Sequence, residues 1–177
     1  MNTFRKATLA DLDRISEIYS RILDLEEAGK VTIGWVRDIY PTRETAQEAV
    51  EAEEMFVLEN ENTVLAAARI NQSQVPEYAS AAWEHPDAPD DKVMVIHTLV
   101  VDPAFSGKGC GTAFIRFYED YAAQNGCPYL RMDTNEKNAT ARRLYAHLGY
   151  KEAGIVHLTF NRIRGVNLVC LEKTLEI

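Results

Sequence analysis

Residues 95–112 read VIHTLVVDPAFSGKGCGT, and this stretch decides how the chain folds. Its first part, Val95–Val101, is mostly apolar and β-branched, which is typical of a buried strand, and Pro103 ends that strand. Three glycines at alternate positions, from Gly107 onward, then precede a helical pattern. Alternating glycines remove side chains where backbone N–H groups can converge, and the positive end of a helix dipole follows them. We therefore expect a turn that binds phosphate.

Two better-known phosphate-binding patterns do not match this turn. A Walker-type loop requires Ser or Thr directly after its lysine, whereas Gly109 follows Lys108. The dinucleotide pattern G-x-G-x-x-G requires a third glycine where Thr112 or Phe114 stands. The turn therefore belongs to neither type.

The composition is that of one globular domain. The chain has 177 residues, of which 46% are apolar and 26% charged, so we expect a single domain over residues 1–177 with a hydrophobic core. The longest loop-like segment, Gln74–Asp91, is rich in proline and predicts a surface insertion between strands. Its Tyr78 and Trp83 are large for a solvated loop, which suggests that the insertion folds over a site.

Charge and cysteine content restrict the partners. The net charge of −8 argues against nucleic acid or an anionic membrane and favours a cationic small molecule or an amine. Cys110, Cys127 and Cys170 are widely spaced and lack a paired metal-ligand spacing, so we expect no metal and a reducing cytosol. No apolar run has the character of a signal peptide or the length of a membrane span. We expect a soluble, cytoplasmic protein.

Hydrophobic periodicity predicts alternating strands and helices. Thr8 and Asp11 form a capping-box pattern ahead of an amphipathic helix that Gly29 ends. Further helices are expected from Pro41-Thr42 to about Glu54, from the glycine turn to Gly126, and over residues 138–147. The expected strands are residues 3–7, 55–58, 64–70, 93–101, 129–133, 155–160 and 166–171. This order combines hairpins with crossovers and predicts a mixed α/β sheet.

A second informative pattern lies in residues 138–150, which read NATARRLYAHLGY. Its apolar residues recur at helical spacing and share one stripe, and Gly149 supplies the left-handed cap that ends the helix. Asn138 and Tyr145 are seven residues apart, so they lie on about the same helical face. Both can therefore reach one ligand.

These two patterns resemble the signatures of the GCN5-related N-acetyltransferase (GNAT) family. Residues 138–150 are similar to the family pattern N-x-x-A-x-x-L-Y-x-x-L-G-F/Y, and the glycine turn is similar to its pyrophosphate loop, Q/R-x-x-G-x-G/A. Ser106 stands where the family usually has Gln or Arg, a departure that leaves the backbone amides intact. The order of elements is also that of the family. The resemblance implies a mostly antiparallel central sheet, flanked by helices and splayed at the central strand.

The resemblance further implies direct acetyl transfer from acetyl-CoA to an amine in a ternary complex. Asn138 matches the family residue that contacts the CoA arm, and Tyr145 matches the tyrosine that lies near the CoA sulfur and acts as general acid. The main-chain groups of the central strand are expected to hold the pantetheine arm. The cofactor-binding residues implied in the strand and in the turn are Leu99, Val100, Val101, Ser106, Gly107, Lys108, Gly109, Cys110, Gly111 and Thr112.

A general base is also needed, because an ammonium group must lose a proton before its nitrogen attacks a thioester. His97 occupies what looks like the position of a histidine in the arylalkylamine acetyltransferase branch, and an ordinary imidazole pKa of about 6.5 suits this role. The alternative is that His97 is a half-buried histidine bonded to a neighbouring carbonyl. A water chain to Glu54 or Asp133 would be a substitute base.

The acceptor is not encoded in a recognisable motif. Trp35 and Tyr40 follow the first helix, where the family commonly builds its acceptor wall, although both could equally fill the core. Together with Tyr78 and Trp83 they are the candidate substrate contacts. We expect a small-molecule amine as acceptor. The alternatives are a protein N-terminus and a non-catalytic module that senses acyl-CoA.

The oligomeric state is not encoded either. The two final strands, residues 155–160 and 166–171, offer an edge through which a homodimer could pair.

Overall fold

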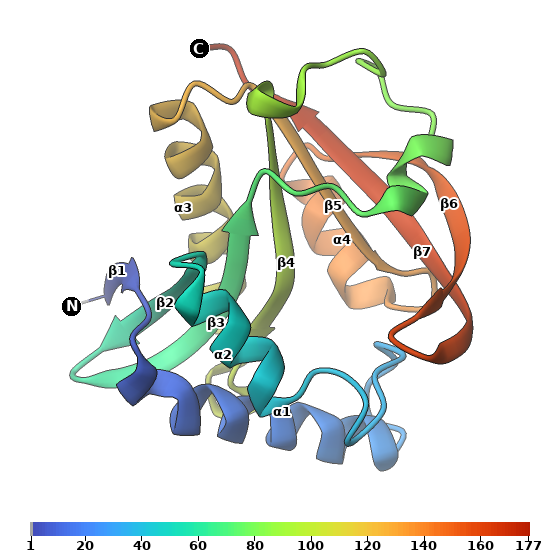
Figure 1. Ribbon diagram of the computed structural model, residues 1–177. Coiled ribbons are helices and arrows are strands. Elements are labelled where there is room, and N and C mark those ends of the chain that lie inside the picture. Colours follow the sequence, from blue (N-terminus) through green and yellow to red (C-terminus); the bar gives the residue numbers. More distant parts are fainter. Residues whose placement is uncertain (1) are drawn as a thin grey trace. The chain divides into compact units, whose positions relative to one another are not determined.

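The computed structural model describes residues 2–177, and Figure 1 shows its helices and strands. The strands are β1 (Asn2–Lys6), β2 (Met55–Asn60), β3 (Thr63–Asn71), β4 (Val93–Val101), β5 (Tyr129–Asn135), β6 (Lys151–Phe160) and β7 (Ile163–Thr174). The α-helices are α1 (Leu12–Glu27), α2 (Arg43–Glu51), α3 (Cys110–Gln124) and α4 (Ala139–His147). Short 3-10 helices are η1 (Leu9–Asp11), η2 (Pro76–Ser80), η3 (Asp90–Lys92) and η4 (Pro103–Phe105).

The strands form a seven-stranded sheet in the order β1-β2-β3-β4-β5-β7-β6. The pairs β1–β2, β2–β3, β5–β7 and β6–β7 are antiparallel, whereas β4 and β5 are parallel with a register from Val93↔Tyr129 to Val95↔Arg131. The expected fold class, a mixed and mostly antiparallel sheet flanked by helices, is confirmed. The predicted order of helices and strands is confirmed as well.

The described chain divides into two compact units. The first contains the residues up to Val31 together with Trp35–Ile70 and His97–Phe117, and the second contains Thr32–Gly34, Asn71–Ile96 and Tyr118–Ile177. Strand β4 passes from the second unit into the first between Ile96 and His97. The expectation of one domain over residues 1–177 remains a prediction.

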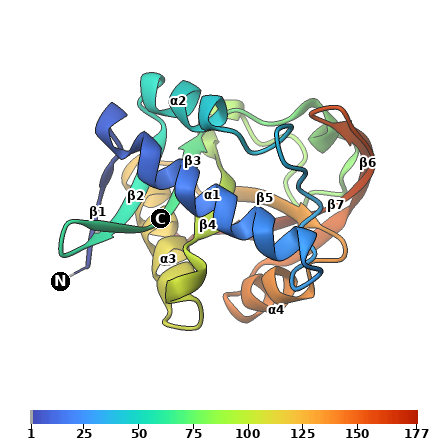
Figure 2. The ribbon, with the colours of Figure 1, turned by 90° about the horizontal axis from the view of Figure 1, so that it is seen from below.

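In the first unit, α1 buries one apolar face. The predicted stripe is buried as expected, with Ile15 at 0% and Tyr19 at 2% exposure. The predicted capping pattern also forms, because the amide of Thr8 donates to Asp11 Oδ2 at 2.8 Å. Arg5 of β1 donates to the same carboxylate at 2.8 and 2.9 Å, which ties the first strand to the start of the helix. Figure 2 shows α1 lying across the strands of this unit with α2 beside it.

Helix α2 is shorter than its sequence pattern predicts. Thr42 Oγ1 accepts a hydrogen bond from the Thr45 amide at 3.3 Å, so the N-terminal cap lies where it was expected. The helix ends at Glu51 instead of near Glu54, since Glu53 adopts a left-handed conformation with φ +57°. No glycine marks this end in the sequence, so the usual stop signal is missing.

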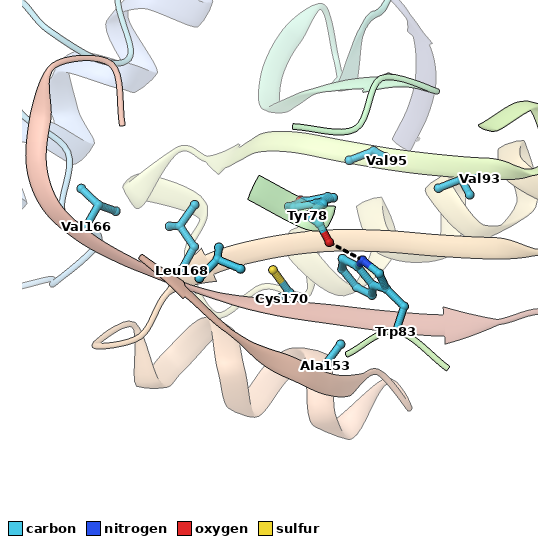
Figure 3. Close-up of a cluster of buried hydrophobic side chains, with 9 residues drawn as sticks. Tyr78, Trp83, Val93, Val95, Ala153, Val166, Leu168 and Cys170 are labelled. Carbon is cyan, nitrogen blue, oxygen red and sulfur yellow. Dashed lines mark hydrogen bonds between the residues drawn. The ribbon is translucent and has the colours of Figure 1, made fainter. Parts of the chain in front are cut away.

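Two aromatic residues of the segment Gln74–Asp91 lie in the core of the second unit, whereas most of the segment is exposed. Tyr78 is 1% and Trp83 is 7% exposed, and Figure 3 shows both rings within a cluster of apolar side chains from β4, β6 and β7. Trp83 Nε1 donates to the carbonyl of Tyr78 at 2.7 Å, and the guanidinium of Arg131 lies 4.4 Å from the centre of the Trp83 ring. The prediction of a surface loop is therefore wrong for these two rings, because their burial depends on strands far away in the sequence.

Candidate active site

The glycine turn lies in the first unit, between the end of β4 and the start of α3. Gly107 has φ +73° and Gly109 has φ +80°, a left-handed conformation that residues with a side chain avoid. Apart from chain neighbours, no atom of residues 2–177 lies within 4 Å of a Cβ built on either glycine. Backbone conformation, and not crowding, is thus the reason for glycine at both positions.

A row of backbone amides in this turn has no protein partner. Within residues 2–177, no acceptor is present for the amides of Gly107, Gly109, Cys110, Gly111 and Thr112. The first hydrogen bond of α3 runs from the Ala113 amide to the carbonyl of Gly109 at 2.9 Å. Free amides at the start of a helix, together with its dipole, attract an anion. The turn therefore offers a set of donors suited to a diphosphate.

The side chains of the turn contribute one positive charge. Lys108 is exposed, and its Nζ lies 4.9 Å from the centre of the Phe105 ring. Ser106 is also exposed, and its side chain is shorter than the Gln or Arg of the resembled family pattern. Binding at this turn therefore relies on backbone amides.

Strand β4 contains a strained residue beside the candidate base. Thr98 has φ +54°, which is an outlier for a β-branched residue and costs about 1–3 kcal/mol. A left-handed residue inside a strand re-aims the neighbouring peptide groups. Thr98 lies directly between His97 and the predicted pantetheine segment, Leu99–Val101. The strain is therefore placed where the chain is expected to meet its ligand.

The loop after α1 is linked to this strained residue. The hydroxyl of Tyr40 is hydrogen-bonded to the hydroxyl of Thr98, and both residues belong to the first unit. Trp35 packs edge-on against Tyr40, with ring centroids 6.0 Å apart, and both aromatic residues are half-buried. The structure thus brings two of the candidate acceptor contacts next to the β4 segment that carries His97.

The candidate bases of the first unit differ in their surroundings. His97 is half-buried on β4, next to the strained Thr98. Glu54 is already in an ion pair, because its Oε2 accepts a hydrogen bond from Arg69 Nε at 2.6 Å. His97 and Glu54 thus both stay candidate bases, and the role of His97 remains a prediction.

In the second unit, the predicted acid Tyr145 lies on α4 and is 8% exposed. Burial raises the pKa of Tyr145 to about 12, and the negative charge of Asp133 adds to this effect. The phenol therefore stays protonated throughout the neutral and mildly alkaline range. Asn138 caps the same helix, since its Oδ1 accepts a hydrogen bond from the Ala141 amide at 3.2 Å. The expected contact of Asn138 with CoA remains a prediction.

Asp133 on β5 is a half-buried titratable group of this unit. It accepts a hydrogen bond from the Tyr78 hydroxyl at 2.6 Å, and burial raises its pKa above the ordinary value. Cys170 lies opposite Asp133 in the β5–β7 register. Burial and the charge of Asp133 raise the pKa of this thiol to about 12. A thiol that stays protonated is a poor nucleophile, which favours direct transfer over an acetyl-cysteine intermediate.

The burial of Asp102 and its arginine partners were not predicted from the sequence. This carboxylate is 0% exposed and is bonded by Arg14 and Arg21 of α1, residues 88 and 81 positions away. An aspartate directly before proline predicts only a local turn cap, and Asp102 does accept a hydrogen bond from the Ala104 amide at 3.0 Å. The two arginines have no signal in the sequence near Asp102.

The described part of the chain was also searched for metal sites and membrane spans. Residues 2–177 hold no group of three or more His, Cys, Asp or Glu side chains that could bind a metal ion. Within the same range, no helix combines the length and the apolar character needed to cross a membrane.

Comparison with known families decides the assignment. The model of the acetyltransferase (GNAT) family matches residues 14–150, which is more than half of the chain. The chain belongs to the acetyltransferase (GNAT) family. The matched range of this GNAT protein contains both the glycine turn and the motif at residues 138–150. The resemblance seen in the sequence is thus confirmed, and with it the expectation of an N-acetyltransferase enzyme.

Curated relatives of this GNAT protein carry N-acetyltransferase names. "Uncharacterized N-acetyltransferase YhfO" of Bacillus subtilis is 31% identical over 111 residues, which are 59% of this chain and 70% of that protein. "N-alpha-acetyltransferase RimI" of Mycobacterium tuberculosis is 31% identical over 78 residues, which are 44% of this chain and 47% of that protein.

Solved GNAT structures share the fold. A GNAT acetyltransferase from Streptococcus agalactiae superposes with a TM-score of 0.82 at 22% identity, covering 99% of this chain and 96% of that chain. YncA from Salmonella typhimurium, solved with its cofactor acetyl-CoA, gives a TM-score of 0.70 at 21% identity, covering 99% and 94%. At these identities the likeness shows the fold alone.

Proposed function

We propose that this GNAT protein transfers an acetyl group from acetyl-CoA directly to the amine of a small molecule. The observation that carries the proposal is the set of amides at the start of α3 that have no acceptor within residues 2–177, those of Gly107, Gly109, Cys110, Gly111 and Thr112. These donors, with two left-handed glycines and a helix dipole, fit the diphosphate of coenzyme A. When bound, acetyl-CoA would supply an acetyl group activated as a thioester.

The glycine turn and strand β4 would bind acetyl-CoA, and His97 would act as the base. The amides of the turn bind the diphosphate, and the main chain of Leu99–Val101 aligns the pantetheine arm and donates an N–H to the carbonyl oxygen as negative charge develops on it. His97 accepts the proton of the ammonium group, so that the nitrogen lone pair becomes available. The new C–N bond forms as the C–S bond breaks, the sulfur keeps the electron pair of the broken bond, and the nitrogen releases its second proton to solvent.

Tyr145 is the proposed hydrogen-bond donor to the leaving sulfur, and Asn138 is a proposed further contact of the CoA arm. Because the pKa of Tyr145 is raised to about 12, its hydroxyl remains a hydrogen-bond donor at every working pH. Full proton transfer to a thiolate with an ordinary pKa of about 8.5 is uphill. Tyr145 therefore acts mainly by donating a hydrogen bond that stabilises the departing sulfur, and solvent completes its protonation.

The acceptor class follows from charge and from the surface near β4. A net charge of −8 favours a cationic amine. Trp35 and Tyr40, half-buried and edge to face beside Thr98, offer ring faces and edges to such a molecule. Tyr78 and Trp83 are not included, because their rings lie in the core of the second unit.

A second acceptor class is a protein N-terminus. The relative from Mycobacterium tuberculosis is named an N-alpha-acetyltransferase, which supports this alternative over 44% of the chain. A peptide acceptor needs an extended groove, whereas a small amine needs only the Trp35–Tyr40 surface. A comparison of the two acceptor types therefore belongs in the first assay.

The experiment that tests the proposal has two steps. Isothermal titration of the folded protein with acetyl-CoA should show saturable binding. A panel of small amines, polyamines, aminoglycosides and N-terminal peptides, followed by thiol release, should then identify the acceptor. Folded protein that gives no binding heat with acetyl-CoA would refute the proposal, whereas binding without thiol release for any acceptor would indicate a CoA sensor.

The proposal extends to location and assembly. The three cysteines of the described chain are free and buried, which supports a reducing cytosol. Strand β6 stands at one end of the strand order, so its outer edge is where a homodimer would pair. Sedimentation analysis tests the latter directly.

A further inference from the structure

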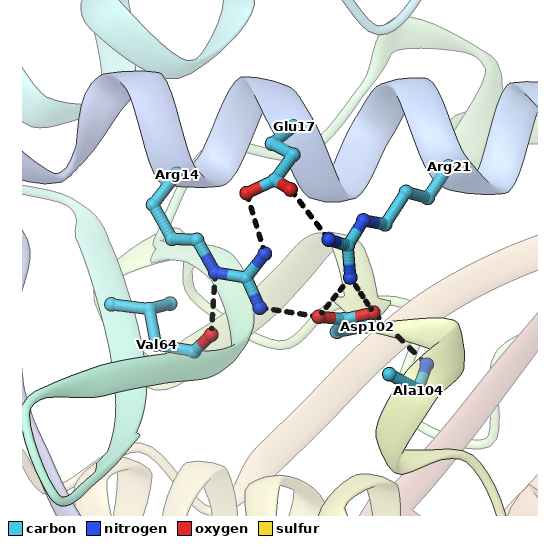
Figure 4. Close-up of polar contacts among 6 residues, drawn as sticks. All are labelled: Arg14, Glu17, Arg21, Val64, Asp102 and Ala104. Atoms are coloured by element: carbon cyan, nitrogen blue, oxygen red, sulfur yellow. Dashed lines mark hydrogen bonds and ion pairs between the residues drawn. The ribbon is translucent and has the colours of Figure 1, made fainter.

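An ionic cluster around the buried Asp102 lies directly before the glycine turn. The Asp102 cluster consists of Arg14, Glu17 and Arg21 of α1 and Asp102 at the end of β4 (Figure 4). Arg21 Nη1 donates to both oxygens of Asp102 at 3.1 and 3.0 Å, and Arg14 also donates to Asp102. Glu17 bridges the two guanidinium groups at 2.7 and 2.5 Å. Two positive and two negative charges thus form one neutral group within the first unit.

The cluster is anchored on both sides. Arg14 Nε donates to the carbonyl of Val64 at 3.1 Å, and the amide of Asp102 donates to the carbonyl of Leu65 at 2.8 Å. Both carbonyls belong to β3. The end of β4 is therefore bound to a helix through its side chain and to a strand through its backbone.

From Asp102 the chain proceeds to the turn through consecutive short hydrogen-bonded steps. The carboxylate of Asp102 accepts from the Ala104 amide at 3.0 Å, and its carbonyl accepts from the Phe105 amide at 2.8 Å. The Ser106 amide then donates to Pro103 at 3.2 Å, and the Lys108 amide donates to Phe105 at 3.4 Å. These bonds connect Asp102 to the exposed residues 106–109, whose other end is held by the hydrogen bond from the Ala113 amide to the carbonyl of Gly109 at 2.9 Å.

The charge of Asp102 is fixed by its neighbours. Its side chain is 0% exposed, whereas those of Arg14 and Arg21 are 22% and 42% exposed. Burial alone would raise the pKa of Asp102, but the Ala104 amide and the two guanidinium groups outweigh it and lower this pKa. The carboxylate therefore stays ionised at neutral pH, and the arginines remain bound to it.

We propose that the Asp102 cluster is a positioning device that holds the glycine turn in its diphosphate-binding shape. Asp102, Arg14 and Arg21 are then determinants of cofactor affinity although they do not contact the reacting atoms. This inference rests on the proposed function, since it concerns the same turn. Its physical basis is preorganisation, because donors that are already in place need no ordering when the ligand arrives.

The test compares two acetyl donors in the Asp102→Asn variant. Acetyl-CoA contains the diphosphate, whereas S-acetylpantetheine contains the same thioester without it. The amide side chain can still cap Ala104, but it loses the charge that binds the two arginines. We expect kcat/KM for acetyl-CoA to fall about tenfold relative to that for S-acetylpantetheine, the smaller end of the loss seen when outer partners of metal ligands are removed. The kcat at saturating acetyl-CoA should change less than twofold.

The matched control is Asp11→Asn. Asp11 is also a nearly buried carboxylate of the first unit that is bonded by an arginine, Arg5, but it lies away from the turn. A merely structural loss would lower the rates with both donors equally in both variants, so the donor ratio separates positioning from stability. We expect Asp11→Asn to leave this ratio unchanged.

Each outcome decides one question. An unchanged donor ratio in Asp102→Asn would overturn the inference while leaving the proposed function in place. If Asp102→Asn does not fold, Arg21→Gln, at the more exposed arginine, must lower the ratio in the same direction for the inference to stand. A wild-type protein that does not bind acetyl-CoA in the titration would instead refute the proposed function.

Discussion

The most direct prediction concerns Gly109, which has φ +80° in the middle of the proposed diphosphate turn. A Cβ added at this position meets no atom within 4 Å among the described residues other than its chain neighbours. The Gly109→Ala substitution therefore changes only the backbone preference. A residue with a side chain in the left-handed region costs about 1–2 kcal/mol.

The location of the turn decides whether this conformational cost lowers the stability of the fold or the affinity for acetyl-CoA. Residues 106–109 are exposed; among them, the Lys108 amide donates to the carbonyl of Phe105 at 3.4 Å, and the Gly109 carbonyl accepts from the Ala113 amide at 2.9 Å. We expect the variant turn to relax to a negative φ in the free protein, which turns its amides away. Binding must then restore the left-handed shape, so the affinity for acetyl-CoA should fall by about 5- to 30-fold.

Gly29→Ala provides the matched control. Gly29 follows α1 with φ +68° and also has nothing within 4 Å of an added Cβ, but it lies outside the turn. The same conformational penalty should lower the free energy of unfolding by about 1 kcal/mol or slightly more. The affinity for acetyl-CoA should not change.

The assay is isothermal titration with acetyl-CoA, combined with urea unfolding of each variant. A Gly109→Ala protein that binds acetyl-CoA within twofold of the wild type would refute the reasoning about the turn. Equal losses of affinity in Gly109→Ala and Gly29→Ala would show that the effect is general and not specific to diphosphate binding.

Three further predictions address the proposed chemistry and the stability of the first unit. Tyr145→Phe should lower kcat with little change in the affinity for acetyl-CoA, and an unchanged kcat would remove Tyr145 from its role. Because the pKa of Tyr145 is about 12, the rate of the wild-type protein should show no alkaline decline from this group below about pH 10. His97→Ala should abolish the acidic limb of the pH–rate profile near neutrality, and a profile that keeps this limb would identify another base. The hydrogen bond from Arg5 lowers the pKa of Asp11 from 3.8 to about 2, so its stabilisation is complete above pH 4 and is lost as the pH falls through about 2. Asp11→Asn should therefore lower the free energy of unfolding by about 2 kcal/mol at pH 7 and by much less at pH 2, as measured with urea at both pH values.

The sequence predicted those parts of the fold that local signals determine. The strand 93–101 and the order of all helices and strands match the structure, since apolar periodicity, a proline and paired glycines act over a few residues. The stop at Gly149 likewise follows from neighbouring residues. The candidate turn was found for the same reason.

The parts that the sequence did not predict depend on distant partners. Tyr78 and Trp83 lie in a proline-rich segment, and their burial follows from contacts with β4, β6 and β7, which no local pattern describes. Asp102 is bound by arginines more than 80 positions away. The left-handed Thr98 has no marker either, because a β-branched residue in an apolar run predicts a regular strand. Contacts between residues far apart in the sequence can be identified only from the folded structure.

The burial of Tyr78 and Trp83 restricts how this protein can be modified. The segment that carries them has the sequence of a dispensable surface loop, which protein engineers often shorten or replace with a tag. Here such a deletion would leave a void of two aromatic side chains beneath β6 and β7 and would strip Arg131 of its acceptor at His85 and of the ring beside it. Insertions and fusions are better placed at the hairpin tip, where Asn161 and Arg162 are exposed.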